Sequence, residues 1–331
     1  MGSHFDQIIR EGLRDGRLDR YYSTSVPEAD KDLGVRVSDS AAAYITRWTP
    51  IRYSPGRIHF VGATIFDRAV ARRLEGGVEV FGGFAGQTLH SASRAKELGA
   101  TSIELHSATA HAATSFDRFQ DATAQWRIEP TWLNARMVAK QVREYEIADR
   151  IYVNSEYSRR TFLDHGVPET KLVRTYLATN PRFDSATRSR TDSTFRVVYT
   201  GGLSVAKGVP VLLEAFSRFR VQDAELVLIG GWSTRAMRRY LEAARRSDPR
   251  VRITLGDPLP ILVNADVYVH PSYQDGYGYA PMEALACGLK LIVTEDTGMK
   301  ENIVEGQNGF VVKTGSADAI LDRLNTIHAA S

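Results

Sequence analysis

The stretch Phe195–Phe219, FRVVYTGGLSVAKGVPVLLEAFSRF, decides the fold. It begins with an apolar run, Phe195–Thr200, turns through two glycines and a lysine, and continues as Val209–Phe219 with apolar residues at helical spacing. A nearly continuous apolar strand that passes through a short glycine-rich turn into an amphipathic helix is typical of a parallel sheet covered on both faces. The stretch therefore predicts a Rossmann-like α/β fold.

The same alternation of strand and helix extends in both directions from this stretch. Downstream, strands are predicted at Glu225–Ile229, Val251–Leu255, Asp266–His270, Lys290–Thr294 and Gly309–Val312. Upstream, strands are predicted at Gly77–Phe81, Ala100–Leu105 and Asp149–Asn154, and helices at Phe5–Gly16, Gln87–Leu98, Asn134–Ala148 and Ser155–His165. A strand, a helix and a second strand in succession indicate a parallel pair, because parallel strands need a crossover connection.

The polar stretch 178–194, ATNPRFDSATRSRTDST, lacks apolar periodicity and is interpreted as an interdomain linker. We therefore expect an N-terminal Rossmann-like domain over residues 1–177 and a C-terminal one over 195–331. Ligands of such sheets bind beyond the carboxyl ends of the strands. The cleft between the two domains is then the expected site.

Composition narrows the class of protein. The chain has 331 residues, long enough for two domains, and its net charge of +3 comes from 42 basic and 39 acidic residues, a balance that argues against nucleic-acid binding. A single cysteine, Cys287, excludes an intrachain disulfide and suits a reducing compartment. With no visible signal peptide or membrane-spanning run, we expect a cytoplasmic protein. Met1–His4 is interpreted as an expression-tag remnant.

The turn Tyr199–Gly208 is the first place where chemistry is expected. Gly201 and Gly202 allow close backbone approach, and Lys207 with the first N–H groups of the following helix forms a positive pocket suited to phosphate. The spacing fits neither the dinucleotide fingerprint nor the P-loop. An ordinary turn with a solvated lysine is the alternative.

The segment Gln274–Gly288, QDGYGYAPMEALACG, is the second. Its glycines permit a tight loop, and a helix is predicted over Pro281–Cys287, with unpaired N–H groups at its amino end that attract an anion. Asp275 and Glu283 offer carboxylates that accept hydrogen bonds from sugar hydroxyls. The segment predicts a site for a ligand that is both phosphate and polyol; an acidic cap on a core helix is the alternative.

Two histidines, His106 and His111, follow a predicted strand in the first half of the chain. Their spacing is poor for metal binding and no cysteine or carboxylate cluster joins them, so no metal site is predicted. A neutral imidazole at a strand's carboxyl end can hydrogen-bond a substrate, whereas a packed or solvated histidine is the commoner outcome.

Several motifs in register resemble one family. YTGGLSVAKGVPVLLEAFSRF, ELVLIGGW, ADVYVHPSYQDGYGYAPMEALACG and VTEDTGMKENIVEGQNGFVV resemble, in order and spacing, the retaining glycosyltransferases of family 4, within glycosyltransferases group 1. The likeness extends over about residues 140–315 and is fainter before them. It implies the GT-B fold, which consists of two Rossmann-like parallel-sheet domains facing a cleft.

The resemblance also implies roles for residues. Asp275 and Glu283 occupy the two positions of the family's Glu-x7-Glu motif, so Glu283 is expected on the donor ribose and Asp275 near the transferred sugar. Lys207 matches the lysine that neutralises the donor pyrophosphate. The implied catalytic residues are His111, Lys207 and Asp275. The implied binding residues are Gly201, Gly202, Lys207, Leu255, Gly256, Asp275, Tyr279, Ala280, Pro281, Met282 and Glu283.

The reaction implied is transfer of a sugar, with retention of configuration, from a UDP- or GDP-linked donor to a glycan, lipid or small-molecule acceptor, with no metal or other cofactor required. Three departures favour an alternative: Asp275 replaces a glutamate, Gly202 replaces an arginine, and both ends of the chain look short. The alternative is a non-catalytic or trimmed relative that binds nucleotide sugar in a regulatory or partner role. An epimerase or phosphorylase on the same fold is less favoured.

Arginines recur along the first predicted helix and its end. They favour peripheral contact with an anionic membrane at its inner face, or with an anionic acceptor, although a solvated basic face is the more ordinary reading. These arginines are Arg10, Arg14, Arg17 and Arg20.

Overall fold

The computed structural model describes residues 3–38, 40–49, 51, 54–184, 189 and 192–330. The chain forms two compact units. The first comprises the described residues of Met1–Ala108, Trp132–Val153 and His165–Thr175, and the second those of Thr109–Thr131, Asn154–Asp164 and Tyr176–Ser331. Residues 1–2 of the interpreted tag, and residues 185–188 and 190–191 of the interpreted linker, lie outside the described residues. The predicted domain limits stay a prediction.

The second unit contains a six-stranded, all-parallel sheet in the order β12-β11-β10-β7-β8-β9. Its strands are β7 (Phe195–Thr200), β8 (Ala224–Ile229), β9 (Val251–Thr254), β10 (Val267–His270), β11 (Lys290–Thr294) and β12 (Gly309–Val312). This is the usual order of a doubly wound sheet, which reverses between its first and fourth strands. The reversal here falls between β7 and β10, and the predicted Rossmann-like sheet is confirmed.

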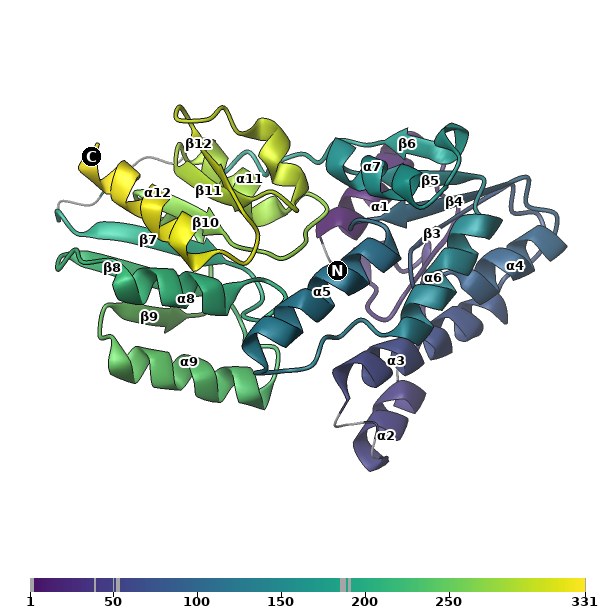
Figure 1. Ribbon diagram of the computed structural model, residues 1–331. Helices are drawn as coiled ribbons and strands as arrows, with labels where there is room; N and C mark the ends of the chain where they lie inside the picture. The colour runs from purple at the N-terminus through teal and green to yellow at the C-terminus, as the bar shows by residue number, and fades with distance from the viewer. Residues whose placement is uncertain are drawn as a thin grey trace. The chain divides into compact units, whose positions relative to one another are not determined.

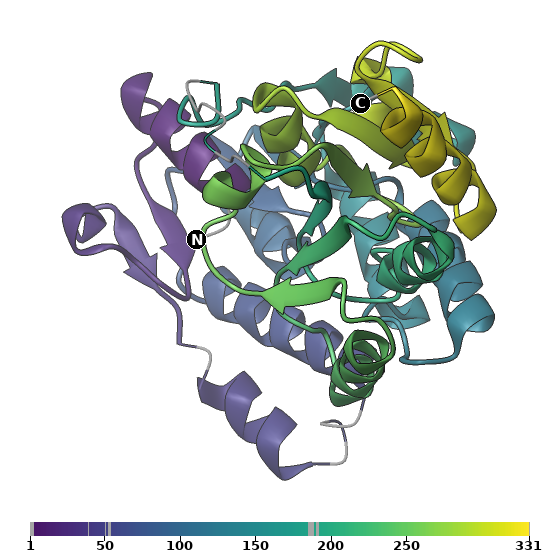
Figure 2. The same ribbon diagram turned by 90° about the vertical axis from the view of Figure 1, so that its left-hand side faces the viewer.

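Helices cover both faces of this sheet. One core contains Val197 and Tyr199 of β7 and is covered by α8 and α12, which pack side by side, and by α9 (Figures 1 and 2). Val198, between them in sequence, belongs to the opposite core with α10 and α11. The helices of this unit are α5 (Ala112–Trp126), α7 (Glu156–Asp164), α8 (Val209–Arg218), α9 (Arg235–Ser247), α10 (Leu259–Leu262), α11 (Tyr279–Ala286), the 3-10 helix η4 (Gly298–Asn302) and α12 (Ala317–Ala329). This two-sided burial explains the continuous apolar strands of the sequence.

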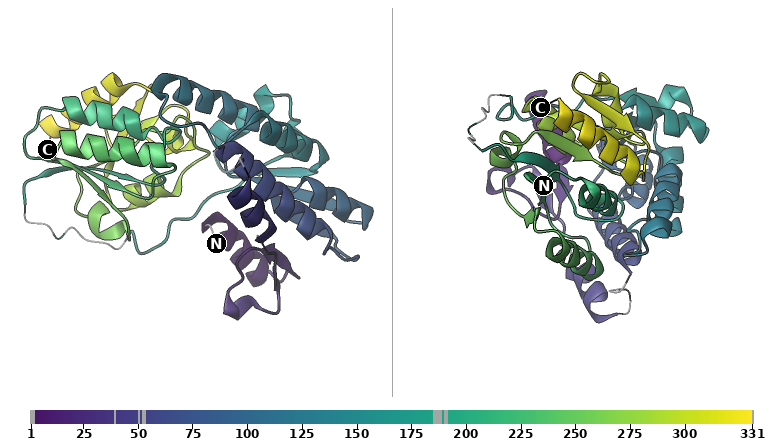
Figure 3. Two further views of the ribbon diagram at one scale, coloured as in Figure 1. Left: turned by 90° about the horizontal axis from the view of Figure 1, so that it is seen from below. Right: turned by 60° about the vertical axis from the view of Figure 1, so that its left-hand side comes forward.

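The first unit contains a four-stranded parallel sheet in the order β3-β4-β5-β6. Helices α3, α4 and α6 pack against one another in this unit (Figures 1 and 3). Its elements are α1 (Ser3–Arg14), β1 (Tyr21–Ser23), η1 (Glu28–Asp30), β2 (Gly34–Arg36), α2 (Ser40–Trp48), α3 (Pro55–Ala71), β3 (Val80–Phe84), α4 (Leu89–Glu97), β4 (Ser102–Ser107), α6 (Ala135–Ile147), β5 (Arg150–Val153), η3 (Glu169–Lys171) and β6 (Leu172–Arg174). Strands β1 and β2 form a separate parallel pair.

One predicted strand was misplaced. Gly77–Phe81 was expected, whereas β3 runs from Val80 to Phe84 and pairs with β4 along its whole length. Two glycines therefore lie inside the strand. A Cβ at Gly83 would lie 2.5 Å from Oγ1 of Thr88, so glycine is needed there for close approach of the following turn.

No helix in the described part of the chain is both long enough and apolar enough to cross a bilayer.

Candidate functional site

The loops after β7 and β10 bring Lys207 and Asp275 together. These strands are neighbours at the reversal of the sheet order, where ligands of doubly wound sheets bind. Lys207 Nζ donates to Oδ2 of Asp275 at 2.6 Å. The ammonium is about one-third exposed and the carboxylate is mostly buried, with side-chain exposures of 36% and 15%. Two residues predicted from separate motifs thus form one ion pair.

A third residue, His270, joins this pair from the end of β10. It is buried, and its Nε2 lies 3.2 Å from the same oxygen of Asp275, within ion-pair distance but without hydrogen-bond geometry. Burial alone would raise the pKa of Asp275, but the charge of Lys207 and the proximity of His270 outweigh it and hold that pKa well below its usual range. Both contacts use Oδ2, and Oδ1 makes no hydrogen bond to a described residue.

The backbone of the Asp275 loop is held by its neighbours. Asp275 N donates to the carbonyl of Asp296 at 3.2 Å, and Gly298 N donates to the carbonyl of Asp275 at 3.1 Å. Ser155 Oγ donates to the carbonyl of Gly276 at 2.6 Å. A Cβ at Gly298 would lie 2.0 Å from that carbonyl oxygen, so only glycine permits the approach. The Asp275 carboxylate is therefore carried by a fixed loop.

The amino end of α11 follows this loop. Gly278 precedes the helix with φ of +93°, and among the described residues neither its N–H nor that of Ala280 has a hydrogen-bond acceptor. The helix begins at Tyr279, two residues before the predicted start at Pro281. Unpaired N–H groups at a helix start carry partial positive charge, so this end can bind an anion.

The predicted start at Pro281 would place Glu283 within the first turn of the helix. Because α11 begins at Tyr279, Glu283 lies beyond that turn. Its carboxylate is half-buried and makes no hydrogen bond or ion pair with the described residues. Burial raises its pKa, and the charge of Arg182 opposes the rise. A partly desolvated acceptor without a partner is suited to a ligand hydroxyl.

The predicted glycines of the β7–α8 turn lie beside the turn after β8. Gly201 has φ of +138°, and its N–H donates to the carbonyl of Ile229 at 2.9 Å. A Cβ at Gly230 would lie 1.8 Å from the carbonyl oxygen of Gly201, so the two turns touch. Gly202 is exposed, and its N–H makes no hydrogen bond within the described residues.

Leu255 and Gly256 follow β9, at the same carboxyl edge of the sheet. The order β7-β8-β9 places them two strands from the Lys207 turn. Leu255 is 69% exposed, and Gly256 has φ of +122° with open space around it. An exposed apolar side chain at this edge offers a surface to a flat ligand group.

His111 is buried at the start of α5 and belongs to the second unit. Its Nδ1 accepts a hydrogen bond from Ala113 N at 3.3 Å, and its own N–H donates to Oγ1 of Thr161 at 2.9 Å. The ring packs edge-on against Phe162, with centroids 5.2 Å apart. His111 is thus a helix cap packed in a core, as well as a residue of a loop near Asp275.

Gln274 connects that loop to the Asp275 loop. With its amide oriented to satisfy both of its polar atoms, the oxygen accepts from Ala110 N at 3.0 Å and Asp275 N at 3.2 Å, and the nitrogen donates to Ser115 Oγ at 3.1 Å. Ala110 and Ser115, which lie on either side of His111 in the sequence, are therefore hydrogen-bonded to Gln274, the residue before Asp275.

His270 was not predicted as a site residue. The sequence carries one usable signal, because His270 ends the strand that leads into the QDGYG motif. A strand-end histidine beside an acidic loop is a reasonable candidate partner for that acid.

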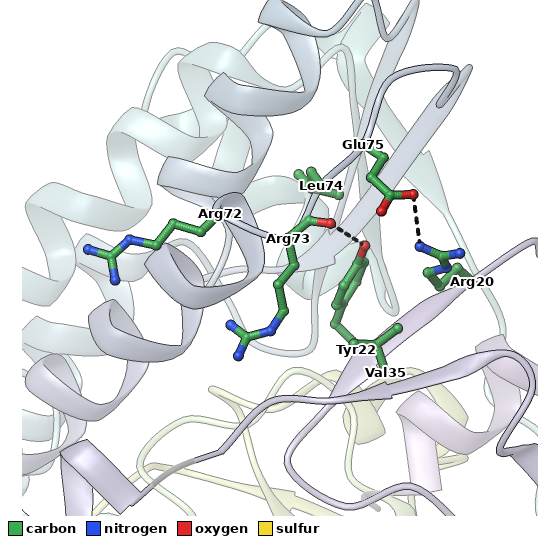
Figure 4. Close-up of a pocket in the computed structure, with 7 residues that line it drawn as sticks. All are labelled: Arg20, Tyr22, Val35, Arg72, Arg73, Leu74 and Glu75. Carbon is green, nitrogen blue, oxygen red and sulfur yellow. Dashed lines mark hydrogen bonds and ion pairs between the residues drawn. The ribbon is translucent and has the colours of Figure 1, made fainter.

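A pocket in the first unit is lined by none of the residues predicted to bind the donor or to be catalytic. Its lining residues are Arg20, Tyr22, Val35, Arg72, Arg73, Leu74 and Glu75 (Figure 4). Arg20 pairs there with Glu75 at 3.4 Å. Farther along the predicted basic face, Arg10 pairs with Asp6 at 2.8 Å and Arg17 with Asp15 at 2.7 Å. These exposed pairs partly neutralise the arginines.

In comparison with known proteins, the second half of the chain matches a family model. Residues 183–329 match the family model described as glycosyl transferases group 1. The capsular polysaccharide biosynthesis glycosyltransferase CapM of Staphylococcus aureus is 26% identical over 138 residues, covering 40% of this chain and 36% of CapM. The alpha-maltose-1-phosphate synthase of Mycobacterium tuberculosis is 30% identical over 132 residues, covering 37% and 34%. The chain spans about a third of the length of these curated relatives.

Solved structures extend the likeness to both units. Sucrose-phosphate synthase from Thermosynechococcus elongatus superposes with a TM-score of 0.75 at 17% identity, covering 98% of this chain and 83% of that one. Anabaena Alr3699/HepE in complex with UDP gives 0.61 at 17% identity, covering 80% and 72%. At these identities the likeness shows the fold, which is GT-B. Residues 183–329 of this protein thus match glycosyl transferases group 1, in a chain whose fold is GT-B.

Proposed function

We propose that the protein is a retaining glycosyltransferase that moves a sugar from a nucleoside diphosphate donor to an acceptor hydroxyl. One observation carries the proposal: the ion pair of Lys207 with Asp275, 2.6 Å long, at the sheet reversal and on the loop that leads into α11. The pair brings a cation that suits a phosphate next to a carboxylate that suits sugar hydroxyls.

Leaving-group stabilisation follows from this arrangement. As the bond from the sugar to the diphosphate breaks, negative charge grows on the outer phosphate. Lys207 and the unpaired N–H groups of Gly202, Gly278 and Ala280 would face that charge. Fixed donors and a cation stabilise such charge without the reorganisation that water requires, which is why no metal is needed in this proposal.

The carboxylates would hold the rest of the donor. Oδ1 of Asp275 is available to a hydroxyl of the transferred sugar, and the unpartnered carboxylate of Glu283 to the ribose hydroxyls. Leu255 and Gly256 would face the base, and Tyr279, Pro281 and Met282 would shape the helix start around the diphosphate. His111 would hydrogen-bond the sugar from its loop near Asp275.

The donor and acceptor are proposed by class. The fold neighbour Anabaena Alr3699/HepE is solved in complex with UDP and in complex with UDP-glucose, which supports a UDP-linked donor ahead of a GDP-linked one. The name of CapM supports a glycan acceptor ahead of a lipid or a small molecule. We place the reaction in the cytoplasm, with peripheral contact at the inner membrane face if the acceptor is a lipid.

A donor screen tests the function. Thermal unfolding would be followed with UDP, GDP, ADP and their common hexose conjugates, in the presence of EDTA, and each ligand that raises Tm would enter a transfer assay. NMR of the product should show the anomeric configuration of the donor. Failure of every nucleotide to raise Tm would contradict the proposal. Binding without transfer to glycan, lipid or small-molecule acceptors would favour a non-catalytic relative, and an inverted product would exclude the retaining mechanism.

A further inference from the structure

Glu129 is a buried carboxylate with an unusual set of partners. It follows α5 and is 7% exposed. Its Oε1 accepts from the N–H of Val205 at 2.8 Å. Its Oε2 accepts from Ser233 Oγ at 2.5 Å and from Thr234 Oγ1 at 2.6 Å. Among the described residues no lysine, arginine or histidine forms an ion pair with it. Three neutral donors therefore satisfy a buried charge.

Those donors come from two different turns. Val205 lies in the turn between β7 and α8 that carries Lys207, and Ser233 and Thr234 lie in the turn between β8 and α9. Thr234 is also the N-cap of α9, where its hydroxyl accepts from Met237 N. One side chain thus fixes the Lys207 turn to the start of a neighbouring helix.

The two turns also bond to each other, which leaves Glu129 a specific task. Leu203 N donates to the carbonyl of Gly231 at 2.8 Å, and Ser233 N donates to the carbonyl of Leu203 at 3.0 Å. These bonds fix the first half of the Lys207 turn. Val205 lies beyond them, and its N–H is held by Glu129 alone. Beyond Val205, the carbonyl of Ala206 accepts from Tyr273 N at 3.0 Å. The carboxylate therefore adds a side-chain contact that holds the turn two residues before Lys207.

We propose that Glu129 is a positioning residue for phosphate binding, which holds the turn Gly201–Gly208 so that Lys207 meets Asp275 and the donor diphosphate. This inference rests on the proposed function. Glu129 itself would not touch the donor, because both of its oxygens are occupied by protein donors. Both oxygens of Glu129 are needed for this role, since together they accept three hydrogen bonds, whereas an amide has only one acceptor oxygen.

The test compares phosphate-bearing and phosphate-free ligands. The dissociation constants of UDP and of uridine would be measured by calorimetry for the parent, Glu129→Gln and the matched control Glu214→Gln, an exposed glutamate on α8. GDP with guanosine, or ADP with adenosine, replaces them if the parent prefers that base. We expect Glu129→Gln to weaken the diphosphate about tenfold and the nucleoside less than about twofold. The control should change neither.

Amide hydrogen exchange supplies a readout that needs no ligand. Exchange in residues 201–208 should accelerate in Glu129→Gln and stay unchanged in 276–286. If that variant is unstable, Ser233→Ala removes one donor to the same oxygen and should show a smaller effect of the same pattern. Equal weakening of UDP and uridine, or unchanged exchange in 201–208, would overturn the inference. A parent that binds no nucleotide would instead defeat the proposed function, before Glu129 is tested.

Discussion

Two strand-to-helix turns of this protein differ in what their backbone N–H groups contact. In the first unit, the turn between β3 and α4 presents its N–H groups to a carboxylate of the chain itself: Glu144 accepts from the N–H groups of Gly86, Thr88 and Leu89. In the second unit, the turn between β10 and α11 leaves the N–H groups of Gly278 and Ala280 without acceptors among the described residues.

The charged side chains near the two turns also differ in their burial. Asp67 accepts from His90 N at 3.0 Å and Ser91 N at 2.9 Å. Lys140 Nζ lies 2.9 Å from Oδ2 of Asp67 and 3.9 Å from Oε1 of Glu144. All of these side chains are buried, so the first turn is a closed internal salt-bridge network. In the second unit Lys207 is partly exposed.

A helix start in a Rossmann-like unit therefore does not by itself indicate a ligand site. An internal carboxylate at one turn satisfies the same N–H groups that an external phosphate would satisfy at another. The difference lies in whether the rest of the unit supplies the anion. In the first unit α6 does so with Glu144, and in the second no element does within the described residues.

The turn between β10 and α11 is called the open turn below. The largest effect should follow from removing Lys207, the cation that contacts Asp275 of this turn from the turn between β7 and α8. Lys207→Met is expected to lower kcat/KM for transfer by about 100-fold or more, because it removes charge stabilisation of the leaving diphosphate. Steady-state kinetics with the identified donor would measure it. The double variant Lys207→Met/Asp275→Asn should recover stability lost to the unpaired Asp275 while transfer stays low. A loss below about threefold in Lys207→Met would contradict the proposed contact of this lysine with the leaving diphosphate.

The next largest effect is expected from removing Glu144, the internal anion at the turn between β3 and α4, called the closed turn below. Glu144→Ala leaves three N–H groups unsatisfied and weakens the environment of buried Lys140, so the free energy of unfolding should fall by about 3 kcal/mol. Urea unfolding would measure it, with the exposed Glu97→Ala on α4 as the control.

The variant Glu144→Ala also tests whether the N–H groups that it leaves unsatisfied bind an external anion, as we propose for the open turn. If the N–H groups are the common feature, millimolar inorganic phosphate should raise the Tm of Glu144→Ala and leave that of Glu97→Ala unchanged. No response to phosphate would show that the two turns differ in more than their occupant.

Glu283→Gln should separate binding from stability at the open turn. Burial raises the pKa of Glu283, so its contribution to stability becomes increasingly unfavourable as the pH rises above the unfolded-state pKa of about 4.3. The glutamine variant should therefore have a higher Tm than the parent without ligand. It should also bind UDP about tenfold more weakly, because a ribose acceptor is lost. A lower Tm without ligand would contradict this account.

The smallest effect concerns acid stability. The lowered pKa of Asp275 means that its stabilising contribution is fully present above the unfolded value of about 3.9 and is lost as the pH falls below it. Asp275→Asn should remove on the order of 1 kcal/mol at pH 7 and less than that at pH 3. Unfolding at several pH values would measure it. An equal loss at both pH values would argue that the contribution is not ionic.

Much of the fold could be predicted because its signals are local. Strands β7, β11 and β12 were predicted with their observed limits, since each is an apolar run buried on both faces. Strand β3 was misplaced because its glycines resemble a turn and only the pairing with β4 shows otherwise. The start of α11 was missed by two residues, as Pro281 marks a first turn less sharply than Gly278 does.

Parallel sheets could be predicted from the sequence alone, and so could Lys207, Asp275 and Glu283 as site residues, because each belongs to a contiguous motif. The tertiary structure was needed to show which of these residues lie together, and that Oδ2 of Asp275 contacts both Lys207 and His270. It alone showed Glu129 holding the Lys207 turn and Glu144 closing the turn of the first unit. The physical reason is that hydrogen bonds and ion pairs act over about 3 Å in space, whatever the separation of their partners along the chain.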